Sequence, residues 1–524
     1  MAGAEQPVRK VTIVGGGTAG WMTAAVLSQW LSKVEIKLIE SDEIGIIGVG
    51  EATIPHIRNF LALAGIDPLK MISESKATFK LGIEFVDWGA PGESYIHGFG
   101  KIGRDMLWLH PHQLWLAAKA RIPDRAEHFD NYSLNCVACH QNKFAFPDPR
   151  NPHSPLADID YAYHFDASLF ARFLRGQCEA RGVTRVEGRI VEVLKDGESG
   201  FVTGVRLTDG REVDGDLFVD CSGMRALLIG DALGIGYEHW NRWLLCDRAQ
   251  AVPCASVSPI TPYTRSTARK SGWQWRIPLQ HRIGNGYVYA SNLISDEEVS
   301  ETLLANLDGE AMADPRPVKF APGRRLKGWE KNVIAIGLSS GFLEPLESTS
   351  IHLIQTGIQK ILGLFPSQGF SQPDIDEFNR QTRYEYEDVR DFIIAHYKVT
   401  RRSGDPFWDH VREMDVPDSL QQRFELFRSS GRFFKHGAAE LFAEESWVQV
   451  LLGQGFEARP DPVAQFVRDE EIVSFLDHIA EVVDDVANDM PDHGEFVSRL
   501  SPSSKAQATG VTSSPAFNLA EVHR

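Results

Sequence analysis

Three glycines near the start of the chain have the type and spacing of a phosphate-binding turn. Gly15, Gly17 and Gly20 occupy the G-x-G-x-x-G places between a β-branched run, VTIV, and a segment with helical periodicity. The first glycine permits the tight turn, the second lets the backbone approach a pyrophosphate, and the third lets helix and strand pack closely. Glu40 ends the next predicted strand, 20 residues beyond Gly20, where a carboxylate accepts from ribose hydroxyls. The segment therefore predicts a βαβ unit that binds an adenine dinucleotide.

A second pattern is the stretch WQWRIP, Trp273 to Pro278. In an extended strand residues i and i+2 point the same way, so Trp273 and Trp275 share one face while Gln274 and Arg276 share the other. Taken alone, the pair is most simply two large core residues of a buried strand.

The elements that must position these residues are spread along the chain. Two later segments, DLFVDCSGMRALL and NVIAIGLSSGFLEPLESTSI, again place a hydrophobic strand before a turn of small residues. Three such pieces separated by long insertions are typical of an FAD domain with a substrate region threaded through it, whereas NAD-only domains stay compact. Aromatic hydroxylases of this architecture carry Gly-Asp in the late turn. Here the turn reads Gly337-Leu338-Ser339-Ser340, which disfavours a hydroxylase.

Between these pieces, residues 71–88 run from a helical end into an alternating strand. Phe79, Leu81, Ile83 and Phe85 fall on one face, and Lys80 falls on the other. Residues 161–183 are predicted to form a helix, and residues 185–223 to form strands with turns.

The pattern is mostly helical from about 371 to 490. We therefore expect an FAD-binding part with insertions over 1–370, a helical part that covers the substrate over 371–498, and a weakly ordered Ser/Ala/Pro-rich tail over 499–524.

Composition narrows the function. The 524 residues include 54 Lys and Arg against 71 Asp and Glu, a net charge of −17, which argues against nucleic acid or an anionic membrane as partner. No apolar run is long enough to cross a bilayer and no signal-peptide pattern opens the chain, so a cytoplasmic location is expected. The run CVACH, Cys136 to His140, has haem-attachment spacing but lacks an export signal, and no zinc-ligand set accompanies it, so no metal is expected.

Several segments together resemble one family. GGGTAGWMTA, GVGEATIP, FKLGIEF, WQWRIP and GFLEPLESTSI occur in the order found in flavin-dependent halogenases of the tryptophan-halogenase type, and the likeness runs from about residue 9 to 460. It implies an α/β FAD-binding dinucleotide fold of the GR2/PHBH-like class, with an inserted substrate-binding sheet region and a mainly helical C-terminal part. It also implies FADH2 from a separate flavin reductase, chloride or bromide as the halide, and hypohalous acid that travels through a tunnel to an aromatic substrate. The resemblance does not decide whether the chain forms a homodimer.

The resemblance also implies roles for individual residues. Lys80 matches the lysine at the tunnel end, whose amine hydrogen-bonds hypohalous acid or becomes a haloamine, and Glu347 matches the active-site glutamate. A solvent-facing strand lysine and a helix-capping acid are the structural alternatives for these two. Thr349 and Ser350 match the halide-contacting pair, although the family more often has glycine at the second place. The FAD contacts implied are Gly15, Gly17, Thr18, Ala19, Gly20, Glu40, Glu51, Ala52, Val191, Leu338 and Ile351.

The same comparison bears on the substrate. Trp273 and Trp275 match the wall that separates flavin from substrate, and His97 and Phe99 match rings that sandwich an indole. Free-tryptophan halogenases hold the amino-acid end with tyrosines and a glutamate in the helical part, but no tyrosine follows Tyr397 here. The implied substrate is therefore indole, a substituted indole or a larger indole-bearing molecule. Trp447 is either another aromatic wall or a core residue. An aromatic monooxygenase and a non-catalytic FAD-binding protein are the alternative functions.

Overall fold

Three strands far apart in the sequence lie next to one another in one sheet. The computed structural model describes residues 7–43, 50–435, 437 and 440–500. In it β1 (Lys10–Val14) pairs in parallel with β12 (Leu217–Asp220), which pairs in parallel with β21 (Val333–Ala335). The threaded FAD fold expected from the sequence is confirmed. The six-stranded sheet is completed by β2 (Glu35–Glu40), β8 (Thr184–Glu187) and β20 (Trp329–Glu330), in the order β20-β21-β12-β1-β2-β8.

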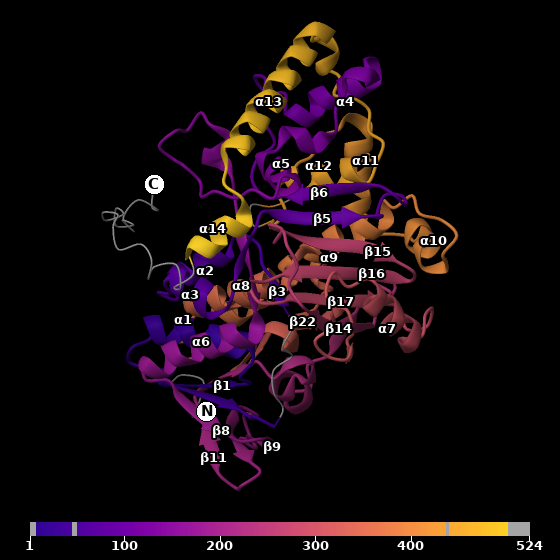
Figure 1. Ribbon diagram of the computed structural model, residues 1–524. Coiled ribbons are helices and arrows are strands. Elements are labelled where there is room, and N and C mark those ends of the chain that lie inside the picture. Colours follow the sequence, from indigo (N-terminus) through magenta and orange to yellow (C-terminus); the bar gives the residue numbers. More distant parts are fainter. Residues whose placement is uncertain (1–6, 44–49, 436, 438–439, 501–524) are drawn as a thin grey trace, which may run out of the picture.

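Helices cover this sheet next to the glycine turn. α1 (Thr18–Trp30) follows the turn directly and packs against both α6 (Ala167–Ala180) and α8 (Ser350–Gly363) (Figure 1). The seven consecutive residues from Trp21 to Leu27 are buried in α1, because the helix is covered on several sides rather than on one stripe.

The helix predicted over 161–183 is wrong in its first part. Residues Ala162–Asp166 form strand β7, which pairs with β3 (Gly50–Ala52) and β4 (Thr78–Lys80) in a small antiparallel sheet. Helix α6 begins only after Asp166, whose carboxylate accepts from the backbone N–H groups of Ser168 and Leu169. An N-cap of this kind ends the strand and starts the helix, and the apolar run before it had concealed the boundary.

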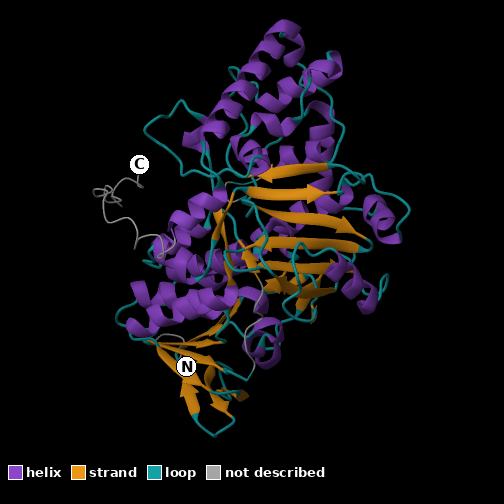
Figure 2. Ribbon diagram, in the orientation of Figure 1, coloured by secondary structure: helices purple, strands orange, loops and turns teal. Residues whose placement is uncertain are grey.

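A seven-stranded sheet carries the tryptophan pair on its middle strand. The sheet is the stack of orange arrows at the right of Figure 2. Strand β16 (Gly272–Pro278) lies between the antiparallel β15 (Tyr263–Arg269) and β17 (Ile283–Tyr289), and every residue of β16 is buried. The outer strands are β18 (Arg316–Lys319), β14 (Arg248–Cys254), β5 (Gly82–Val86) and β6 (Ser94–Gly98), in the order β18-β14-β17-β16-β15-β5-β6.

The alternating segment 78–86 is split between two sheets. Its first part is β4 and its second is β5, with Leu81 between them, so the chain crosses from the small antiparallel sheet to the seven-stranded one at this point. Both faces are covered there, and Lys80 is completely buried. Two further three-stranded sheets are β11-β10-β9 (Glu212–Asp214, Val202–Leu207, Ile190–Lys195) and β13-β19-β22 (Tyr237–His239, Gly323–Arg325, Gly341–Phe342).

The rest of the described chain is mainly helical. α9 (Gln372–Lys398) is followed by α10 (Pro406–Glu413), α11 (Asp418–Ser430), α12 (Glu444–Gly453), α13 (Asp469–Asp489) and α14 (His493–Leu500). α13 packs back on α4 (Pro111–Arg121) and α5 (Leu134–His140), as Figure 1 shows at the far end from the glycine turn. The remaining α-helices are α2 (Ile57–Leu63), α3 (Pro68–Glu74) and α7 (Asp296–Ala305). Residues 501–524 of the predicted tail, and Gly48 and Val49 of GVGEATIP, lie outside the described residues.

Candidate active site

A cavity of about 1040 Å³ opens at the glycine turn. Gly15 has φ +114°, and a Cβ on it would lie 2.2 Å from the carbonyl oxygen of Cys221, so only glycine fits. A Cβ on Gly20 would lie 1.8 Å from the carbonyl oxygen of Gly15, so α1 can approach the turn this closely because residue 20 has no side chain. A Cβ on Gly17 would meet nothing within 4 Å, so this glycine faces the open cavity. The turn therefore has the cradle that a pyrophosphate needs.

Glu40 stands at the edge of the same cavity, at the end of β2. Its carboxylate accepts from the indole nitrogen of Trp21 at 3.2 Å and forms ion pairs with Arg175 and Arg185. A Cβ on Gly16 would lie 1.7 Å from Glu40 Oε2, so the carboxylate lies directly against the turn. This geometry suits an acid that contacts a ribose beside a bound pyrophosphate.

Most of the other residues implied to contact flavin or halide line the cavity, and three do not: Gly20, Val191 and Thr349. Burial raises the pKa of Glu51 to about 7, and this residue lines the cavity. Val191 does not reach it: its side chain is 56% exposed, and the preceding Arg189 and Ile190 line the cavity instead. Further lining residues are Gly15, Gly17, Thr18, Ala19, Ala52, Leu338, Ser350 and Ile351, whereas Gly20 and Thr349 are buried beside it.

Both tryptophans of β16 line the cavity and are held there in different ways. A Cβ on Gly286 of β17 would lie 2.1 Å from two ring atoms of Trp275, so the Trp275 indole occupies the space that a side chain on residue 286 would need. Trp273 instead donates its indole N–H to Glu344 Oε2 at 3.0 Å. The ring centroids of the two tryptophans are 6.1 Å apart.

Lys80 lies outside this cavity but touches its edge through one serine. Lys80 Nζ donates to the carbonyl of Thr53 at 3.0 Å and to Ser348 Oγ at 2.8 Å, and Ser348 lines the cavity. Burial lowers the pKa of Lys80 to about 7, against the opposing effect of Glu347. Ser348 adopts φ +58°, a left-handed conformation that costs energy for a residue with a side chain and that places its hydroxyl beside the amine.

Glu347 is buried between two histidines. Burial by itself would raise the pKa of Glu347, but His97 and His396 outweigh it and lower the pKa to about 2. The carboxylate is therefore ionised, and His97 Nδ1 donates to its oxygens at 2.9 and 3.0 Å.

His396 Nε2 lies 2.7 Å from Glu347 Oε1, although its N–H direction is off the line between the atoms and it has no well-aligned partner among the described residues. Its Nδ1 is 2.8 Å from the carbonyl of Phe392, and a carbonyl only accepts, so Nδ1 carries a proton.

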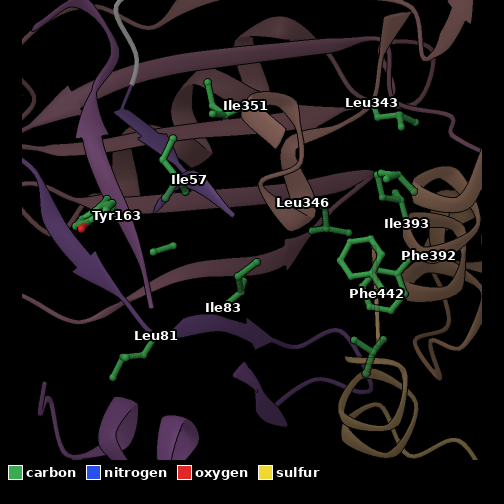
Figure 3. Close-up of a cluster of buried hydrophobic side chains, with 14 of the residues drawn as sticks. Ile57, Leu81, Ile83, Tyr163, Leu343, Leu346, Ile351, Phe392, Ile393 and Phe442 are labelled. Atoms are coloured by element: carbon green, nitrogen blue, oxygen red, sulfur yellow. The ribbon is translucent and has the colours of Figure 1, made fainter. Parts of the chain in front are cut away.

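Aromatic rings lie around Lys80 and the histidines that contact Glu347. The ring of Phe99 lies 5.2 Å from Lys80 Nζ, so the structure brings this residue to the lysine. Trp447 is buried on α12, with its ring 4.8 Å from that of Phe392, so it is packed in the core in this structure. Leu346, Phe392 and Phe442 belong to the same apolar cluster, where the Phe392 and Phe442 rings stack at 3.8 Å (Figure 3).

Sequence reasoning missed Ser348, His396 and Glu344 as site residues. His396 follows Phe392 by one helical turn in α9 and reaches a glutamate 49 positions earlier in the chain. The local sequence around it, DFIIAHY, gives no indication of this partner. No group of three or more His, Cys, Asp or Glu side chains is placed to hold a metal ion in the described ranges. None of the helices described is long and apolar enough to cross a membrane.

A glycine cradle, a ribose-edge acid and a threaded parallel sheet define an FAD-binding α/β protein, and the buried Lys80 and Glu347 lie beyond the edge of its cavity. Residues 10–469 match the family described as tryptophan halogenase, and the chain belongs to that family.

Relatives of known name agree with this assignment. The chain is 36% identical over 447 residues to tryptophan 6-halogenase ThaL of Streptomyces albogriseolus, covering 80% of this chain and 82% of that protein. Among solved structures it is similar to Xcc4156, a flavin-dependent halogenase from Xanthomonas campestris, with 47% identity, a TM-score of 0.90, and 95% and 99% of the two chains covered. BrvH, a flavin-dependent halogenase from Brevundimonas sp. BAL3, gives 45% identity, a TM-score of 0.90, and coverage of 94% and 99%. The protein is a flavin-dependent halogenase, an oxidoreductase that uses FADH2, O2 and halide to halogenate an aromatic substrate.

Proposed function

We propose that the substrate is an indole-type ring that lacks the free amino-acid group of tryptophan. The sequence has no tyrosine after Tyr397 with which to hold such a group. In the described part of the segment between α11 and α12, Phe433 and Phe442 are buried. The acid there, Glu440, forms an ion pair with Arg423 at 2.7 Å, so its charge is already neutralised within the protein. Aromatic contacts without a zwitterion clamp favour indole, a substituted indole or a larger indole-bearing molecule.

The observation that supports the reaction assignment is the position of the Lys80 amine. It contacts Ser348 at the edge of the cavity, and Glu347 directly precedes Ser348 in the sequence. Bound FADH2, supplied by a separate flavin reductase, would provide hypohalous acid from O2 and halide. On the chain's side, the amine of Lys80 hydrogen-bonds or captures the halogen electrophile. The ionised Glu347 stabilises positive charge on the ring and accepts its departing proton.

The halide is proposed to lie at the start of α8. Thr349 caps this helix and Ser350 begins it, so backbone N–H groups and the positive end of the helix dipole face an anion there. Thr349 Oγ1 is buried and has no hydrogen-bond partner in the described chain, which supports a ligand at this place.

The wall role of the tryptophans is proposed as well. Trp273 and Trp275 line the cavity. Two large rings there keep the substrate from the flavin, so that only a small electrophile passes. Without this separation, direct oxygen transfer to the substrate becomes geometrically feasible.

The experiment is mass spectrometry of indole and of tryptophan incubated with the protein, FAD, a flavin reductase, NADH and O2, with chloride and bromide in parallel. We expect a halogen isotope pattern on indole and not on tryptophan, and no product with Lys80→Met. Efficient halogenation of tryptophan would refute the missing clamp. Retained product in Lys80→Met would refute the role of the lysine.

A further inference from the structure

Glu344 is a buried acid that the chemistry above does not use. It is 0% exposed, and it precedes Glu347 by three residues in the turn that leads into α8. Its neighbours Leu343 and Pro345 both line the flavin cavity, whereas Glu344 itself does not. Its side chain therefore lies behind the cavity surface rather than in it.

The carboxylate of Glu344 joins two elements at one oxygen atom. Oε2 accepts from Trp273 Nε1 at 3.0 Å and from the hydroxyl of Tyr397 at 2.5 Å. Oε1 has no hydrogen-bond partner in the part of the chain that the structure describes. Burial raises the pKa of Glu344 to about 7, against the opposing effect of these two donors.

Tyr397, the second donor to Glu344, is held rigidly by its neighbours. It lies next to His396 near the end of α9, so consecutive residues of one helix reach Glu344 and Glu347, the two acids of the same turn. Tyr397 is itself packed against Trp88 and Trp408, with ring centroids 5.3 and 6.0 Å away. Its hydroxyl is thus held in place, and the carboxylate that it donates to is held with it.

The two tryptophans of the wall differ in what fixes them. The shape of the strand fixes Trp275, because its ring fills the space above Gly286. Trp273 has an indole N–H to satisfy as well, and a buried N–H without an acceptor is unfavourable, so its ring is favoured in the orientation that reaches Glu344.

We propose that Glu344 is a positioning residue that fixes the indole of Trp273 in the wall, with Tyr397 anchoring its carboxylate. The consequence for the reaction rests on the proposed wall function: a Trp273 ring free to turn lets the electrophile escape or lets substrate approach the flavin. Loss of Glu344 then lowers the fraction of reduced flavin that yields halogenated product, without preventing flavin binding.

The first test needs no flavin. Indole N–H signals of protein labelled with ¹⁵N-tryptophan are recorded by NMR, and the Trp273 signal is assigned with Trp273→Phe. We expect this proton to be protected from solvent exchange in the wild type and in Glu344→Gln, whose amide oxygen is still an acceptor. In Glu344→Leu we expect the signal to shift and exchange at least about tenfold faster. An unchanged signal in Glu344→Leu would overturn the proposal.

The second test measures halogenated product per NADH oxidised, together with hydrogen peroxide released. Glu344→Leu is expected to lower the product ratio at least about tenfold and to raise peroxide, while Glu344→Gln stays within about twofold of wild type. A Gln variant as impaired as the Leu variant would overturn the positioning role.

Tyr397→Phe gives an independent arm if the Leu protein does not fold, and it should shift the Trp273 signal in the same direction. A Trp273 signal at its wild-type position in that variant would overturn the anchoring. Should wild type yield no halogenated indole, the proposed substrate fails, and the NMR result still decides the role of Glu344.

Discussion

Replacing Lys80 with methionine removes an amine and keeps a side chain of similar length. The lysine is completely buried, and among the described residues its ammonium group has the Thr53 carbonyl and the Ser348 hydroxyl as hydrogen-bond acceptors. We expect halogenation to be abolished, because the amine that contacts the halogen electrophile is gone. FAD affinity should stay within about twofold of wild type, because Lys80 does not line the cavity and meets it through Ser348. Flavin binding and product formation are measured by fluorescence titration and mass spectrometry.

The same substitution has a calculable effect on stability. Burial lowers the pKa of Lys80 from 10.5 to about 7. In the unfolded chain the amine stays protonated up to about pH 10.5, so between pH 7 and 10.5 folding is accompanied by release of a proton. The free energy of unfolding therefore rises with pH through that window. From these two pKa values, burying the amine costs about 4 kcal/mol at pH 7 and about 1 kcal/mol at pH 9.5.

Methionine removes this cost and also loses two hydrogen bonds, each contributing about 0.5–1.5 kcal/mol at either pH. The Lys80→Met protein should therefore be more stable than wild type at pH 7, and its advantage should shrink by about 3 kcal/mol at pH 9.5. Urea unfolding of both proteins, followed by circular dichroism at the two pH values, measures this change. A stability difference that is the same at pH 7 and pH 9.5 would refute the depressed pKa of the lysine.

Three other substitutions test the site. Glu347→Gln removes the charge that His97 contacts and should slow product formation at least about a hundredfold in single-turnover assays, with near-normal turnover counting against the assigned role. Gly286→Ala places a Cβ 2.1 Å from the ring of Trp275, so the ring must move, and peroxide release should rise at the expense of product; unchanged coupling would show that the wall tolerates the shift. Gly16→Ala places a Cβ 1.7 Å from a carboxylate oxygen of Glu40 and should weaken FAD binding about tenfold by fluorescence titration, and an unaltered Kd would contradict the role of that contact.

Much of the flavin side was predictable from local sequence. The glycine spacing, the strand before it and the acid after β2 sit within one βαβ unit, so short-range patterns were sufficient. The boundary at Asp166 was not predictable by periodicity, because a buried strand and a buried helix both give an apolar run.

The substrate side depended on contacts between distant segments. Alternation put Lys80 on the face opposite Phe79 and Leu81, which is the solvent side of a half-buried strand. The fold covers that side as well, because β4 belongs to one sheet and β5 to another, so the lysine is buried and its pKa falls. His97 and His396 reach Glu347 across 250 and 49 positions, a separation that no local pattern encodes.

The dinucleotide fold, the family and the types of residue available for chemistry could be inferred from the sequence, because they follow from glycine spacing, strand periodicity and motif order. The states and partners of those residues come from the folded chain: Glu347 is ionised between two histidines, the Lys80 amine has a lowered pKa, and Trp273 donates a hydrogen bond to Glu344. The physical reason is that burial and neighbouring charge set the ionisation of a side chain, and both come from segments that meet only when the chain has folded.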